Sequence, residues 1–154
     1  MVKATRISFG GTAGIVTGMA LLVGLDAAHA GKASVIGALL IIAVADNLTD
    51  SLSVQMYEES ERLEKREAFL RTVSNFATRF LVGLTFVVIV ALFWKRAVAV
   101  GVAWGMALLS AMSYILARGR KTRAIAEMVR HIGIALLVIV VSEGIGYWIK
   151  THVS

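Results

Sequence analysis

The chain contains no cysteine and no proline, and only 17% of its 154 residues are charged. Without cysteine there are no disulfide bonds, thiolate metal ligands or thiol nucleophile, so a bound metal would need oxygen, imidazole or thioether ligands. Without proline, any break in a helix must come from glycine or from polar side chains that compete for backbone hydrogen bonds. So few charges do not fit the composition of a soluble domain.

In place of charge the chain has apolar sequence, with 58% hydrophobic residues. Five apolar stretches are each long enough to cross a bilayer as a helix, and they run over about 8–28, 33–56, 76–94, 97–117 and 131–149. We therefore predict an all-α integral membrane protein in which residues 1–154 form a single five-helix transmembrane domain. The spans and their short connections fill the chain and leave no room for a separate catalytic domain.

The net charge of +6 comes from lysines and arginines that lie mainly in the predicted loops. In a soluble protein this charge would suggest nucleic acid, but here the positive-inside rule accounts for it, so we expect membrane lipid and no nucleic acid as a partner. Basic residues gather in the loops on the same side as the N-terminus. This bias predicts a multi-pass protein with a cytoplasmic N-terminus and its C-terminus outside.

Two carboxylates, Asp46 and Asp50, interrupt the second apolar stretch. A charged side chain at the bilayer centre costs about 2.5–3.5 kcal/mol on insertion scales, so it usually marks a path for an ion or a proton. Because the two aspartates lie four residues apart on a helix, they could bind one cation between them or share a proton. Further oxygen ligands would come from Asn47, Thr49 and Ser53.

A structural alternative stays open for these acids. Asp46 and Asp50 could pair with Arg79, with Asn75 or with backbone groups, and so only hold the helices together. Arg79 lies inside the third predicted span, whereas the second contains no basic residue. In the fifth span, Glu143 could be a proton or exit site, or simply an interface acid that water reaches.

A glutamate-rich run follows the second span. It contains neither glycine nor proline, so we predict that the second helix extends into the cytoplasm as a helical segment over 57–72. Its charges could form no more than ion pairs on a solvated helix. Alternatively, Glu58 and Glu61 gather cations for Asp50, because carboxylate oxygens suit Mn²⁺, Ca²⁺ and Fe²⁺. Tyr57 could then support a ligating carboxylate by a hydrogen bond.

Three features carry a family resemblance: the five-span plan, a glycine-rich first span that ends in Gly24-Leu25, and a second span that runs into Tyr57-Glu58-Glu59-Ser60-Glu61. In these features the chain resembles the vacuolar iron transporter family. The resemblance covers essentially the whole chain and is most specific over Ile42 to Glu61. It implies a homodimer without a tightly bound cofactor, which exchanges Fe²⁺ or Mn²⁺ for protons along a path between the two first helices and neighbouring spans.

The resemblance is uneven at the metal ligands. Members of the family carry an aspartate in the first helix and a methionine in the second as membrane ligands. Here Ala13 stands near the position of that aspartate and Asp50 at that of the methionine. The carboxylate has thus moved to the second helix, which favours harder cations such as Mn²⁺. The long glutamate- and methionine-rich insertion of eukaryotic members is also missing.

The resulting expectation is a divalent metal cation antiporter of the Fe²⁺/Mn²⁺ type that uses the second-helix carboxylates. A lipid alcohol phosphotransferase would need an Asp-Gly pair and a longer aspartate array, so we expect no enzyme. A non-transporting membrane assembly protein is the remaining alternative. It would leave the acids structural and would use the glycines at spacing four, Gly10, Gly14 and Gly18, for helix contacts.

Overall fold

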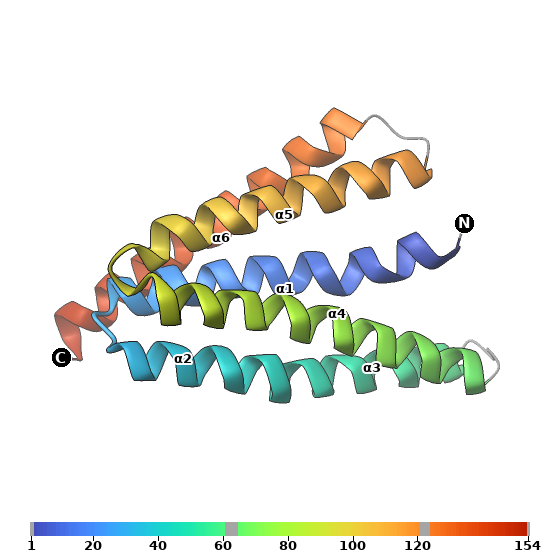
Figure 1. Ribbon diagram of the computed structural model, residues 1–154, viewed down its shortest axis with the longest axis horizontal. Helices are drawn as coiled ribbons and strands as arrows, with labels where there is room; N and C mark the ends of the chain where they lie inside the picture. Colours follow the sequence, from blue (N-terminus) through green and yellow to red (C-terminus); the bar gives the residue numbers. More distant parts are fainter. Residues whose placement is uncertain (1, 61–64, 121–123, 154) are drawn as a thin grey trace.

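The computed structural model describes residues 2–60, 65–120 and 124–153, and the regular structure in these ranges is all helical. The elements are α1 (Val2–Ala27), α2 (Lys32–Ile41), the π-helical segment η1 (Ile42–Asp46), α3 (Asn47–Ser60), α4 (Lys65–Leu92), the 3-10 turn η2 (Trp94–Arg96), α5 (Ala97–Arg120) and α6 (Ala124–His152). They run up and down an elongated bundle, with the two termini at opposite ends (Figure 1).

Four helical stretches are long and apolar enough to cross a membrane: Lys32–Tyr57, Phe69–Leu92, Trp94–Arg118 and Ile125–His152. Within α1, Gly11–Ala27 forms a shorter apolar helix. The all-helical class is confirmed, and the apolar helices fit a multi-pass membrane protein.

The central helix of the bundle is α1, which packs against α4, α5 and α6. Its side chains Ile15 and Met19 are fully buried, and they belong to one cluster with Phe86 of α4 and Leu109 of α5. Many large apolar side chains on the outer faces of the other helices are exposed. This distribution, with apolar groups both inside and outside, is what a bundle surrounded by hydrocarbon requires, because there packing rather than exclusion from water holds the helices together.

Two of the glycines at spacing four, Gly14 and Gly18, lie against residues of the same chain. A Cβ atom added at Gly14 would lie 3.5 Å from the Cα atom of Arg79, and one added at Gly18 would lie 2.7 Å from the ring of Phe86. Both neighbours belong to α4, so the small residues let α1 and α4 approach closely.

A similar close approach joins α1 and α6 at Gly146. A Cβ atom there would collide with the carbonyl oxygen of Gly24 and would lie 2.8 Å from the Cβ atom of Ala27. We expect Gly146→Ala to push the helices apart and to lower the free energy of unfolding by about 1–3 kcal/mol, the usual cost of overpacking. Thermal unfolding in detergent measures this effect.

The matched control is Gly144→Ala on the same helix, because nothing lies within 4 Å of a Cβ atom at Gly144. This variant should unfold at or slightly above the wild-type temperature, since alanine favours a helix more than glycine does. Equal unfolding temperatures for the two variants would contradict the close α1–α6 contact.

The charged segment predicted over 57–72 is divided between two helices. The second span continues as α3 to Ser60, and α4 begins at Lys65. Residues 65–72 therefore start the third span rather than extend the second one. These charged residues favour a helix in either position, so the sequence pattern could not show which of the two helices they join.

Candidate functional site

The second span is not one continuous α-helix, because η1 lies between α2 and α3. Here the backbone N–H of Asn47 donates to the carbonyl oxygen of Ile42, five residues back instead of four. Such π-helical turns are rare and often occur at functional sites. The extra residue changes which way the side chains before it face relative to those after it. Asp46 is the last residue of η1, so the change lies at the first of the two candidate acids.

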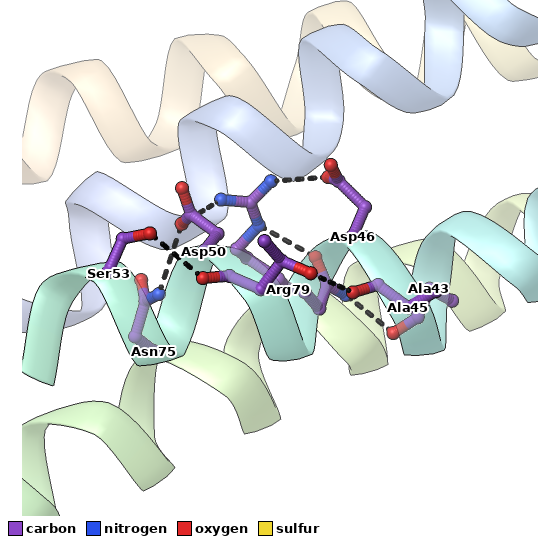
Figure 2. A network of polar contacts seen from close by, with 9 residues as sticks. Ala43, Ala45, Asp46, Asp50, Ser53, Asn75 and Arg79 are labelled. Carbon is purple, nitrogen blue, oxygen red and sulfur yellow. Dashed lines mark hydrogen bonds and ion pairs between the residues drawn. The ribbon is translucent and has the colours of Figure 1, made fainter.

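Polar side chains satisfy backbone carbonyls around η1 (Figure 2). The amide Nδ2 of Asn47 donates to the carbonyl of Ala43 at 2.7 Å, and the hydroxyl of Thr49 donates to that of Ala45 at 3.0 Å. One turn later, the hydroxyl of Ser53 donates to the carbonyl of Thr49 at 3.0 Å. These polar residues, which the sequence suggested as metal ligands, thus use their hydrogens on their own helix, and only their oxygen lone pairs remain for a ligand.

One guanidinium group, that of Arg79 on α4, binds both candidate acids (Figure 2). Its Nη2 atom lies 3.1 Å from Oδ2 of Asp46, and its Nη1 atom binds Oδ2 of Asp50. The Nε atom donates to Oδ1 of Asn47 at 2.7 Å, and the amide of Asn75 lies 3.4 Å from Oδ2 of Asp50. The pairing with Arg79 and Asn75 that the structural alternative named is therefore present.

The cluster of Arg79, Asp46 and Asp50 is buried on its cationic side and open on its anionic side. The side chain of Arg79 is 7% exposed, whereas those of Asp46 and Asp50 are 53% and 37% exposed. Asp46 and Arg79 lie near the middle of apolar stretches long enough to span a membrane, and Asp50 lies one helical turn further along its stretch. Two carboxylates face one guanidinium, so the ionised cluster carries one uncompensated negative charge.

Two further features lie near the cluster: a small cavity and a buried hydroxyl group. A cavity of about 20 Å³ lies beside Arg79 between α1, η1 and α4, and a cavity of roughly 10–15 Å³ is enough for one water molecule. In addition, Ser51 is 3% exposed, and its hydroxyl has no hydrogen-bond partner among the described residues. A buried unpaired hydroxyl is a typical contact for a water molecule or an ion.

The other predicted site residues lie elsewhere. Glu143 is exposed on α6, which packs against α1 and α5, so the structure does not bring it to the aspartates. Tyr57 is exposed on α3. Glu58 belongs to α3 but its side chain is outside the described part, as is the whole of Glu61. Among the described residues, no three or more His, Cys, Asp or Glu side chains form a group that could hold a metal.

Sequence reasoning missed the π-helical turn and the buried hydroxyl of Ser51. It named Arg79 only as one of several potential partners, whereas the structure places this residue at the centre of the cluster. A basic residue inside an apolar span was the available signal, because such a residue usually faces the interior of the bundle and pairs with another ionisable group or with backbone carbonyls.

Comparisons of the chain with protein-family models, with curated proteins and with solved structures found no match. The resemblance to the vacuolar iron transporter family therefore stays a prediction from the sequence motifs. The function has to be argued from the chemistry of the cluster.

Proposed function

We propose that this protein carries a divalent metal cation across a membrane in exchange for protons, with Asp46 and Asp50 as the ion-binding carboxylates. The observation that supports this most is the charge imbalance of the cluster: one guanidinium faces two carboxylates, and both carboxylates keep substantial exposure. A surplus negative charge in an apolar bundle is costly unless a cation or a proton joins it.

Oxygen chemistry supports the choice of cargo. The carboxylate oxygens of Asp46 and Asp50 form the open side of the cluster, and oxygen ligands suit Mn²⁺ and other hard divalent cations. A proton and a metal ion compete for the same carboxylate oxygens, because metal ligands must be deprotonated. Exchange of a metal for protons therefore needs no second site.

A non-transporting membrane assembly protein is the second candidate, and one observation favours it. All three nitrogens of the Arg79 guanidinium have partners on the second span, and the side chain is almost fully buried. Such an arrangement would also suit a purely structural set of polar contacts that holds the second span against α4. Under this alternative the protein does not transport ions, so replacement of a carboxylate changes its stability only.

Flux of Mn²⁺ into liposomes, with and without a pH gradient, tests the proposal. We expect Asp46→Asn and Asp50→Asn each to lower the flux by about tenfold or more, since an amide cannot supply the negative charge that binds the cation. Asp26→Asn is the matched control, because Asp26 is exposed at the end of α1. Wild-type flux in both cluster variants, or no flux of the wild-type protein under any gradient, would favour the assembly alternative.

A further inference from the structure

We propose that Arg79 is a tethered counter-cation, whose positive charge prevents the Asp46–Asp50 pair from holding a divalent ion tightly. This inference rests on the proposed transport function and adds to it an explanation of how the ion leaves. An ion pathway must bind its ion well enough to admit it and weakly enough to release it.

The geometry places the guanidinium within direct reach of the ion. Arg79 binds the Oδ2 atoms of both aspartates, one with each terminal nitrogen. A cation held between the same two carboxylates would therefore lie only a few ångströms from the positive charge of Arg79. Repulsion between charges at such a distance is strong in a low-dielectric interior.

A charge count shows which loaded states Arg79 favours. With Arg79 the cluster carries −1 when empty and +1 with a divalent ion. Without Arg79 the same states would carry −2 and 0. Because the cost of a charge in a low-dielectric medium rises with its square, Arg79 removes the electrostatic advantage of the divalent-loaded state over the empty one.

The charged groups that face one another here are Asp46 and Asp50 from the second span and Arg79 from α4. The residues of α1 that line the neighbouring cavity, Gly14, Thr17, Gly18 and Leu21, carry no charge. The electrostatic potential at this site is therefore set mainly by these three charged side chains.

The surroundings of Arg79 allow it to yield to an incoming ion without losing every partner. Its Nε atom remains bound to Oδ1 of Asn47 at 2.7 Å when the two terminal nitrogens release the carboxylates. The cavity of about 20 Å³ beside it is large enough for one water molecule, which could accept a hydrogen bond from a released nitrogen.

Binding of Mn²⁺ to the purified protein in detergent, followed by the electron paramagnetic resonance signal of free Mn²⁺, tests the inference. We expect Arg79→Gln to tighten Mn²⁺ binding by about tenfold or more, because it removes the repelling charge. Arg79→Lys should stay close to the wild-type affinity, and Arg118→Gln, at an exposed arginine of α5, is the control. Unchanged or weaker binding by Arg79→Gln would overturn the inference.

A second variant decides the question if Arg79→Gln does not assemble. Asn47→Asp keeps the arginine but places another negative charge at its Nε atom, so it should also tighten Mn²⁺ binding, and its failure to do so would overturn the inference. Asp46→Asn separates the two hypotheses. If it abolishes Mn²⁺ binding while Arg79→Gln leaves the affinity unchanged, the counter-cation role is wrong and the proposed function stands. If Asp46→Asn and Asp50→Asn both bind Mn²⁺ like the wild type, the proposed function itself is wrong.

Discussion

Replacement of Arg79 by leucine is expected to lower the free energy of unfolding by about 3 kcal/mol, because removal of the buried cation of this cluster leaves two carboxylates in an apolar bundle without compensation. Both carboxylates would lose the guanidinium, and Asn47 would lose the donor to its Oδ1 atom. Leucine is apolar and nearly as large, so the loss would report the polar contacts more than a cavity. Unfolding by sodium dodecyl sulfate in mixed micelles measures the change.

The combination of Arg79→Leu with Asp46→Asn and Asp50→Asn should recover a large part of this stability, since the triple variant no longer carries an unpaired charge in the bundle. Such recovery between neighbouring sites is the expected sign of direct coupling. Arg118→Leu, at an exposed position, should have little effect and serves as the control. If the triple variant were as unstable as Arg79→Leu alone, the ion pairs would not be the source of the loss.

Deletion of Ala45 is expected to have the second large effect, a loss of Mn²⁺ flux together with a lower unfolding temperature. The deletion removes the additional residue of η1 and so favours a regular α-helix through the second span. Each residue of an α-helix turns the chain by about 100°. The deletion would therefore rotate the buried side chains of α2, Val35 and Leu39, by about this angle relative to Asp50.

After this change the protein could not keep both the buried face of α2 in the core and Asp50 in contact with Arg79. Either Val35 and Leu39 would leave the core, or Asp50 would turn away from Arg79. Ala45→Ser is the control, because the side chain of Ala45 is exposed and the substitution keeps the length of the chain. Wild-type flux and stability in the deletion variant would show that the π-helical turn is dispensable.

The helical class and the approximate spans could be predicted because they depend on the length of apolar runs, which the sequence displays directly. The π-helical turn could not be predicted in this way. Its residues, Ile42–Asp46, include neither glycine nor proline and fit an ordinary helix. A tertiary contact reaches the end of the turn, where the Nε atom of Arg79 donates to Oδ1 of Asn47, and the amide of Asn47 in turn donates to the carbonyl oxygen of Ala43 in the same span. The choice of Arg79 as that partner is not visible in the local sequence.

The candidate site, too, could be predicted from the sequence only in part. The spacing of Asp46 and Asp50 was sufficient to place both carboxylates on one face of a helix, and both contact the same arginine. The choice of that arginine depends on which helix lies beside the second span. In the same way, the spacing of Gly14 and Gly18 predicts a close helix contact but does not name α4 as the neighbour.

The opposite positions of the two termini have a practical consequence for protein engineering (Figure 1). A peptide linker that joins the end of one copy to the start of a second would have to pass from one end of the bundle to the other. In a bilayer, a flexible polar linker cannot make that crossing. A tandem pair in which one copy carries a disabled site would therefore need an additional transmembrane helix between the copies to give both the same orientation.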